Sequence, residues 1–401
     1  MTIRQHLIDP EICIRCNTCE SRCPTGAISH ARNYVVDAET CTFCMKCVRP
    51  CPTGAIDNWF EVELPFTLAK QHGWQRLPEP ASSGEVGSQP AEALDDEAAQ
   101  ILEIAHRGVG AGSRAPVSAA KPRVNTFTRQ NPARATVTGN ARITAKDADS
   151  DVHHIIIDFG AEPFQYLEGQ SIGVIPPGTD EHGRPHAMRL YSVATARDGE
   201  RPNTNNMGLT VKRVMARRPD GSLVPGVGSN WMCDLEIGDE LDVIGPFGST
   251  FLLPEDPMVD VLMVCTGTGV APFRGFTHRR RRTSPNGPGR LYLFFGARTP
   301  EELPYFGPLQ RYLQTELHRE LVYSRLQLSE REYVQHRLRK RADLVADLLS
   351  KSTTHLYVCG LSGLEDGVDE ALTEIAVRHG LDWASLRSEM RDQGRFHVET
   401  Y

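Results

Sequence analysis

The sequence lacks the features that would place this chain in a membrane or on nucleic acid. Its 401 residues contain no run of about 18 apolar residues, which argues against a membrane-spanning helix. The N-terminal stretch MTIRQHLIDPEICIRC has no apolar core of the kind that secretory signals require. A formal net charge of −7 argues against general nucleic-acid binding, because proteins of that class carry a basic face. We therefore expect a cytoplasmic protein of two or three domains.

Two familiar signatures of catalytic chemistry are also missing. The glycine turn in VCTGTGVAPFRGF does not have the Gly-x-Gly-x-x-Gly spacing, so an ordinary Rossmann fingerprint is absent there. No pair of Glu-x-x-His motifs lies on candidate bundle helices, so the sequence does not predict a di-iron site of its own.

Cysteine, in contrast, is abundant and unevenly placed. Eleven cysteines without an export signal indicate metal or redox chemistry in preference to disulfides. Eight of them lie in two runs, CIRCNTCESRCPTGAI from Cys13 and CTFCMKCVRPCPTGAI from Cys41. Each run has the spacing Cys-x2-Cys-x2-Cys-x3-Cys-Pro. We expect two of the remaining cysteines, Cys233 and Cys265, to lie in the core.

The duplicated run is typical of bacterial two-cluster ferredoxins, in which the fourth cysteine of each run binds the other cluster. The resemblance implies two [4Fe–4S] clusters. The ligand sets would be Cys13, Cys16, Cys19 and Cys51 for the first cluster, and Cys41, Cys44, Cys47 and Cys23 for the second. Zinc is the competing interpretation, because Cys-x2-Cys pairs also form zinc sites. The cysteine triples and the repeated Cys-Pro favour iron–sulfur.

Basic residues accompany both cysteine runs and also form a separate cluster. Arg15, Arg22, Lys46 and Arg49 lie among the ligands. They would either raise the potential of a cluster or remain as solvated surface. The run from Arg279 to Arg282 predicts a solvated helix end or, alternatively, a docking patch for an acidic partner.

The chain divides into four parts by composition and pattern. Residues 1–61 form the cysteine module, and residues 62–122 read as an Ala/Gly/Pro/Ser-rich linker with a short helix in DDEAAQILEIAHR. Short alternating runs such as HHIIIDF and GLTVKRV predict an antiparallel β-barrel over residues 123–256. Apolar strands that alternate with helices predict a parallel α/β sheet over residues 257–401. The expected fold class is multidomain, α+β and α/β.

The barrel contains a candidate flavin site. In RLYSVAT, Arg189, Tyr191 and Ser192 lie alternately along one predicted strand. Arg189 offers a guanidinium for a diphosphate, Tyr191 offers a flat ring, and Ser192 offers a small hydroxyl. In GVGSNWMCDL, a glycine-rich turn leads into a helix start that suits a diphosphate. In the α/β part, Gly267, Thr268 and Gly269 follow a strand and open a helix, where a dinucleotide can approach the backbone.

In order and spacing, residues 123–401 resemble plant-type ferredoxin–NADP reductases almost from end to end. The resemblance is carried by EGQSIGVIPPG, RLYSVAT, GVGSNWMCDL, GPFGSTFLLP, TGTGVAPFRGF, VYSR, YVQ, LYVCGLSGLEDGVDEAL and HVETY. It implies that FAD binds to Arg189, Tyr191 and Ser192. It places the FAD diphosphate at Gly228 and Ser229, and it adds Lys212 to the cofactor-binding residues.

The same resemblance implies NADPH as the electron donor. The family grips the 2′-phosphate with a Ser-Arg pair and a tyrosine, which match Ser324, Arg325 and Tyr333. Gln335 would lie near the adenine, and Arg331 would replace a family lysine while keeping its charge. An enzyme for NADH would more often place an acid there to meet the free ribose.

The chain end matches the hydride-transfer centre of these reductases. In the family, the terminal aromatic residue stacks on the flavin and is displaced by nicotinamide, which implies this role for Tyr401. Ser192, Cys359 and Glu399 match the residues around the transfer centre. We therefore expect these four side chains to form the catalytic group.

The joined modules resemble the reductase component of benzoyl-CoA 2,3-epoxidase, also called benzoyl-CoA oxygenase component A. That resemblance implies electron flow from NADPH through FAD and two [4Fe–4S] clusters to a separate di-iron oxygenase in aerobic benzoate breakdown. Two alternatives stay open at this point. One is a fused ferredoxin–NADP reductase that serves another acceptor or works toward NADPH. The other is a redox sensor without enzymatic activity.

Overall fold

The computed structural model describes most of the chain outside residues 79–111. The described residues are 3–10, 13, 15, 17–44, 46–48, 51, 55–56, 58–62, 64–75, 77–78, 100, 103, 112–180, 182–217, 221–326 and 331–401. Cys16 and Arg49 lie outside them, as does the predicted linker helix except for residues 100 and 103. Within the described part, no helix is both long and apolar enough to cross a membrane.

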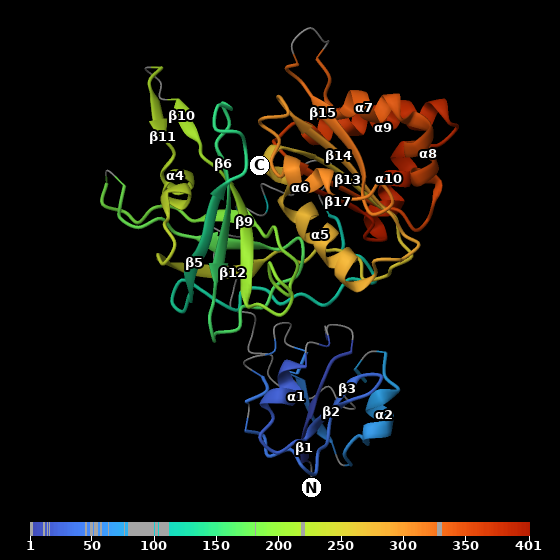
Figure 1. The fold of residues 1–401 in the computed structure, drawn as a ribbon. Helices are drawn as coiled ribbons and strands as arrows, with labels where there is room; N and C mark the ends of the chain where they lie inside the picture. Colours follow the sequence, from blue (N-terminus) through green and yellow to red (C-terminus); the bar gives the residue numbers. More distant parts are fainter. Residues whose placement is uncertain are drawn as a thin grey trace.

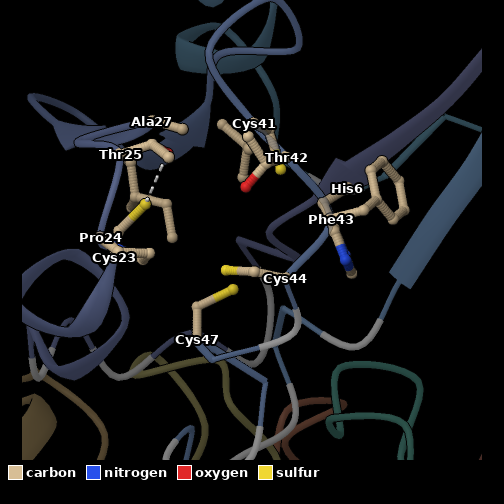
Figure 2. Close-up of a pocket in the computed structure, with 12 residues that line it drawn as sticks. His6, Cys23, Pro24, Thr25, Ala27, Cys41, Thr42, Phe43, Cys44 and Cys47 are labelled. Carbon is tan, nitrogen blue, oxygen red and sulfur yellow. Dashed lines mark hydrogen bonds between the residues drawn. The ribbon is translucent and has the colours of Figure 1, made fainter.

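The cysteine module consists of two short antiparallel pairs and the loops between them. Strand β1 (Ile3–Leu7) pairs with β4 (Asn58–Val62), and β2 (Ile28–His30) pairs with β3 (Tyr34–Val36). Helix α1 (Thr18–Arg22) lies within the first cysteine run. Figure 1 shows this blue module below the other two parts, and Figure 2 shows four of its cysteines around a shared space.

Helix α2 (Leu68–His72) belongs to this module, although the sequence placed the module's end at residue 61. The buried Gln71 amide accepts from the backbone N–H of Val36 at 3.0 Å and donates to its carbonyl at 2.9 Å. Asn33 donates to the carbonyl of Trp74 at 2.8 Å, and Gln5 bonds both backbone groups of Phe66. Side-chain amides therefore bind this polar segment to the strands, where its composition had suggested a linker.

The second part is an antiparallel barrel with the strand order β8-β7-β12-β5-β6-β9. Its strands are β5 (Ala133–Arg142), β6 (Val152–Asp158), β7 (Ser171–Val174), β8 (Arg189–Ser192), β9 (Asn206–Lys212) and β12 (Glu240–Phe247). A bridge between Val193 and Leu209 joins the two edge strands and closes the sheet. Strands β10 (Met215–Arg217) and β11 (Leu223–Pro225) form a hairpin that leads to helix α4 (Val227–Asp234).

The third part is a five-stranded parallel sheet with the order β15-β14-β13-β16-β17. Its strands are β13 (Val261–Thr266), β14 (Leu291–Ala297), β15 (His318–Tyr323), β16 (His355–Gly360) and β17 (Phe396–Thr400). The helical segments are η2 (Gly267–Gly269), α5 (Val270–Thr283), α6 (Phe306–Gln310), α7 (Val334–Lys340), α8 (Ala342–Ser350), α9 (Leu364–Arg378) and α10 (Trp383–Asp392). Because β14 and β15 lie on one side of β13 while β16 and β17 lie on the other, the strand order reverses between β13 and β16.

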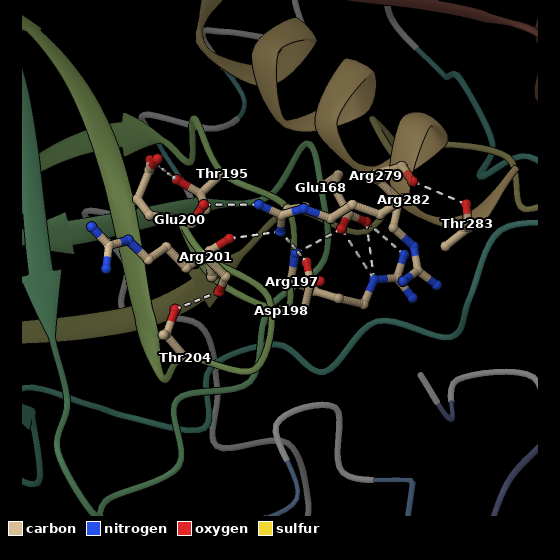
Figure 3. A network of polar contacts seen from close by, with 12 residues as sticks. Glu168, Thr195, Arg197, Asp198, Glu200, Arg201, Thr204, Arg279, Arg282 and Thr283 are labelled. Atoms are coloured by element: carbon tan, nitrogen blue, oxygen red, sulfur yellow. Dashed lines mark hydrogen bonds and ion pairs between the residues drawn. The ribbon is translucent and has the colours of Figure 1, made fainter. Parts of the chain in front are cut away.

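Most of the arginine run at the end of α5 is buried or half-buried, and of its four arginines only Arg281 is exposed. Arg279 and Arg280 are each only 6 % exposed. Arg280 donates to the carbonyls of Pro257 and Val259, and Arg282 donates to the carboxylate of Asp198 in the barrel (Figure 3). Arg282 therefore holds α5 against the barrel, while Arg280 holds the helix against the loop that precedes β13.

A buried carboxylate in the barrel connects several of these contacts. Glu200 accepts two hydrogen bonds from Arg274 of α5, at 2.7 and 2.9 Å, and one from His154 at 2.9 Å. Thr195 also donates to it, at 2.7 Å. Burial alone would raise the pKa of Glu200, but the bonds from His154 and Arg274 outweigh burial and hold that pKa well below its ordinary value. The carboxylate is therefore ionised and joins the barrel to the parallel sheet.

Glu200→Gln should destabilise the contact between the barrel and the sheet. Removing the charge leaves Arg274 buried without its partner, and we expect a loss of about 3 kcal/mol in the free energy of unfolding. Denaturant titration of the full chain measures this loss. The matched control is Glu240→Gln, because Glu240 pairs with Arg134 on the exposed surface, where both side chains are more than half exposed. A control effect as large as that of Glu200→Gln would contradict the assignment.

Candidate functional site

A cavity of about 390 Å³ lies where the strand order reverses. The carboxyl ends of β13, β14, β15 and β16 contribute to its lining through Gly267, Gly296, Ser324 and Ser362. Lys212, the last residue of barrel strand β9, contributes to the lining of the cavity from the barrel. Ligands of open α/β sheets bind outside the carboxyl ends of the strands at such a reversal. The cavity is therefore the candidate nucleotide site.

Most of the residues predicted to grip NADPH lie at this cavity. Ser324, Tyr333 and Gln335 line it together. Arg331 lines a neighbouring cavity instead, with Lys340 and Arg337. Arg325 is exposed and follows Ser324 directly, with its backbone N–H bonded to the carbonyl of Arg298 at 2.8 Å. The structure thus brings three of the five residues to one cavity and leaves the two arginines at its margin.

The sequence analysis missed Arg298, which lines the same cavity. Burial lowers the pKa of Lys212, and the charge of Arg298 lowers it further. Two cations, one from the barrel and one from the sheet, therefore converge at this cavity, where Arg298 also pairs with the buried Glu302 at 3.7 Å. Arg298 directly follows the strand RLYLFFGA, so the rule for carboxyl strand ends could have found it.

Gly269 allows α5 to begin unusually close to β16. A Cβ atom on Gly269 would lie only 2.1 Å from the carbonyl oxygen of Cys359, so no larger residue fits without a backbone shift. Cys359 is fully buried, and burial raises the pKa of its thiol well above the ordinary value. It therefore stays a neutral thiol. Glu399 is its register partner on β17.

Tyr401 is held in place although it ends the chain. Its backbone N–H donates to the carbonyl of Gly360 at 3.0 Å, and its carbonyl accepts from Ser362 at 3.0 Å. The phenol oxygen lies 2.7 Å from the hydroxyl of Thr268 in the glycine turn. The ring is half exposed and lies beside the turn that opens α5. Thr268 and Tyr401 are therefore in direct contact, while the stacking of Tyr401 on the flavin stays a prediction.

Two of the candidate flavin residues, Arg189 and Gly228, meet at the start of α4. Arg189 directs one guanidinium nitrogen to the carbonyls of Ala187 and Met188, both at 3.0 Å. A Cβ atom on Gly228 would lie 2.7 Å from Cγ of Arg189, so a glycine is needed for the first turn of α4 to pass the arginine. The backbone N–H groups of this turn and the guanidinium fit a diphosphate.

The ring side of the flavin site lies along β8. Tyr191 packs against the barrel core, and burial raises the pKa of its phenol. The hydroxyl of Ser192 lies 3.5 Å from that of Ser171 on β7. Ser229 accepts a hydrogen bond from the backbone N–H of Val214 at 3.1 Å, which fixes the turn before α4. The hydroxyl groups of Tyr191, Ser192 and Ser229 suit the binding of FAD. The individual role of each residue stays a prediction.

The second ligand set surrounds one small cavity, as Figure 2 shows. Its lining includes all four cysteines of that set: Cys23, Cys41, Cys44 and Cys47. His6 closes the same cavity with Phe43, their rings stacked 4.4 Å apart. Across the described residues, no three His, Cys, Asp or Glu side chains meet the geometry of a single metal ion. Four cysteines with this spacing around one space are the ligand set that a [4Fe–4S] cluster takes in two-cluster ferredoxins.

The first ligand set is described only in part, because Cys16 lies outside the described residues. Cys19 and Cys51 are 7 % and 6 % exposed and belong to one apolar cluster, with Cys13 packed against it. The two core predictions hold, since Cys233 is 4 % exposed and Cys265 is fully buried. Arg15, Arg22 and Lys46 are exposed, which agrees with solvated surface.

Comparison with known proteins decides the family. The 4Fe-4S binding domain family matches residues 6–29 and 34–57, and the Oxidoreductase NAD-binding domain family matches residues 263–370. The ferredoxin–NADP reductase of Spirulina sp. is 37 % identical over 69 % of this chain and 98 % of its own length. That of Thermosynechococcus vestitus is 38 % identical over 69 % of this chain and 75 % of its own length. The chain belongs to the ferredoxin–NADP reductase family.

A solved ferredoxin–NADP reductase supports the fold. The structure from Plasmodium falciparum has a TM-score of 0.55 and 23 % identity, and the match covers 69 % of this chain and 99 % of that one. The chain is thus an oxidoreductase of the ferredoxin–NADP reductase type with an N-terminal 4Fe-4S module.

Gly228→Ala should weaken FAD retention in this ferredoxin–NADP reductase. The added Cβ would collide with Arg189, and the shift would disturb the predicted diphosphate seat. We expect less flavin per chain after desalting, measured by absorbance of the released cofactor. Gly307→Ala is the control, because a Cβ there meets nothing within 4 Å. Equal flavin content in Gly228→Ala and the control would show that the seat lies elsewhere.

Proposed function

We propose that this chain is an NADPH-dependent reductase that delivers electrons to a separate di-iron oxygenase, benzoyl-CoA 2,3-epoxidase, during aerobic benzoate breakdown. The observation that carries the proposal is the joining of two sites in one chain. A nucleotide cavity lies at the reversal of the parallel sheet, and four cysteines surround a second cavity in the N-terminal module. A reductase that only served a free ferredoxin would not need the second site.

The chemistry follows from the groups that fit these sites. When bound, FAD accepts a hydride from NADPH and returns electrons singly, and two [4Fe–4S] clusters carry single electrons. Lys212 and Arg298 would hold nucleotide phosphates, and Ser192 would contact the flavin ring. Cys359 supplies a neutral thiol, which can donate a hydrogen bond but cannot act as a charged nucleophile. Tyr401 would have to leave the ring face for nicotinamide to enter.

A second candidate is a fused ferredoxin–NADP reductase for another acceptor. It is favoured by the relatives, which carry the name ferredoxin–NADP reductase and match 69 % of this chain. Affinity capture from cells grown on benzoate separates the two candidates. Recovery of a di-iron oxygenase supports the first, and recovery of a different redox protein without the oxygenase supports the second.

The cofactor content is tested by chemical analysis of the anaerobically purified chain. We expect about eight iron and eight sulfide per chain, as two [4Fe–4S] clusters require, together with one FAD. Addition of NADPH should then bleach the flavin and produce the electron paramagnetic resonance signal of reduced clusters. Zinc in place of iron, or clusters that stay oxidised with NADPH, would overturn the proposed function.

Arg325→Ala should weaken NADPH while leaving NADH unchanged. The guanidinium would meet the 2′-phosphate, which NADH lacks, and a charge-assisted hydrogen bond contributes about 2 kcal/mol. We expect kcat/KM for NADPH to fall roughly thirtyfold in dye-reduction assays. Arg311→Ala removes another exposed arginine and serves as the control. Equal losses for both nucleotides would mean that the phosphate binds elsewhere.

A further inference from the structure

The cysteine module touches the barrel through a ligand of the first set. The side-chain amide of Gln165 donates to the backbone carbonyl of Cys51 at 3.3 Å. Both residues are nearly inaccessible, with exposed fractions of 9 % and 6 %. Gln165 belongs to the barrel segment that precedes β7. A buried hydrogen bond between modules fixes the position of this one ligand against the barrel.

Apolar packing surrounds that hydrogen bond. Cys19 and Cys51 share one cluster with Leu167 and Leu252, which are 7 % and 1 % exposed and lie outside the cysteine module. Ala120 completes the cluster from the segment that enters the barrel. The contact surface is therefore continuous from the first ligand set to the reductase part.

The segment that joins the modules is itself bound to the reductase part. Ser113 donates to the carbonyl of Phe396 at 2.8 Å, and the carbonyl of Ser118 accepts from Glu255 at 3.1 Å. Ala119 forms a bridge with Pro254. These bonds fix residues 113–119 on the reductase part. The segment therefore belongs to the surface that faces the cysteine module.

A short chain path connects this contact to the flavin residues. Leu167 and Gln170 close a turn, because the backbone N–H of Gln170 donates to the carbonyl of Leu167 at 3.1 Å. The next residue is Ser171, whose hydroxyl lies 3.5 Å from that of Ser192. The ligand Cys51 thus contacts a segment that leads through one turn to the predicted flavin ring.

The second ligand set reaches the outer surface. Cys44 is exposed, and so are Pro24, Thr25 and Thr42, which line the same cavity (Figure 2). Cys47, in contrast, is buried at 7 % exposure and belongs to the apolar cluster shared with the first set. The second set therefore extends from the core of the module to its solvent face.

We infer that the two clusters work in a fixed order, which deepens the proposed function and rests on it. The cluster at Cys13, Cys16, Cys19 and Cys51 is the entry point for electrons from the flavin. The cluster at Cys41, Cys44, Cys47 and Cys23 is the exit point, and the acceptor protein meets the face around Cys44. One hydride from NADPH supplies two electrons, one for each cluster, and the other products are NADP⁺ and one proton.

Two ligand variants test the order by rapid-freeze electron paramagnetic resonance. In Cys44→Ala, NADPH should still reduce the first cluster at the wild-type rate. In Cys13→Ala, the second cluster should stay oxidised with NADPH over that time, while dithionite still reduces it. The reverse pattern, with the second cluster reduced quickly in Cys13→Ala and the first reduced slowly in Cys44→Ala, overturns the inference.

Gln165→Leu provides a test that leaves every cluster ligand in place. Loss of the amide should slow cluster reduction by NADPH at least fivefold, while flavin reduction and the dithionite-reduced cluster spectrum remain those of the wild type. Gln314→Leu, at an exposed position of the parallel-sheet part, is the control and should change neither rate. A wild-type rate of cluster reduction in Gln165→Leu contradicts an entry point at Cys51.

The outcome for the wild-type chain separates the two proposals. Clusters that NADPH cannot reduce in the unaltered protein overturn the proposed function itself. Clusters that NADPH reduces, but in the opposite order in the variants, overturn only the inference about entry and exit.

Discussion

Buried ion pairs between the barrel and α5 are the constraint on which the arrangement of the active parts depends. Glu200 of the barrel binds Arg274 of α5, and Asp198 of the barrel binds Arg282 at the end of the same helix. The nucleotide cavity takes Lys212 from the barrel and Arg298 from the sheet, so it exists only while the two parts keep this alignment. Removing one partner of a buried ion pair lowers the stability of the fold strongly. The pairs therefore hold the two sides of the cavity in place as well as stabilising the fold.

The sequence predicted those features that depend on local patterns. Alternating apolar runs gave the barrel strands, and the glycine turn at Gly267 lies between β13 and α5 as expected. The cysteine spacing grouped the four residues of the predicted second ligand set, and these four surround one cavity. These succeed because strand periodicity and ligand spacing are properties of neighbouring residues, and neighbouring residues are what a single sequence displays.

The features that were missed depend on distant residues. The arginine run on α5 looked like solvated charge because Asp198, which binds Arg282, lies far away along the chain. Helix α2 was read as part of a linker because side-chain amides anchor it, among them the buried Gln71 that bonds Val36. In both cases, polar residues became interior once a partner from another segment satisfied their hydrogen bonds, and composition alone cannot show such a partner.

Strand β9 separates the nucleotide cavity from the contact that the cysteine module makes with the barrel. Its first residue, Asn206, accepts a hydrogen bond from Tyr166, which is next to the Gln165 that contacts the cysteine module. Its last residue, Lys212, lines the nucleotide cavity. A strand of this length spans about 20 Å, so the two contacts lie at opposite ends of the barrel. The nucleotide cavity and the contact with the cysteine module are therefore separated by the whole length of β9.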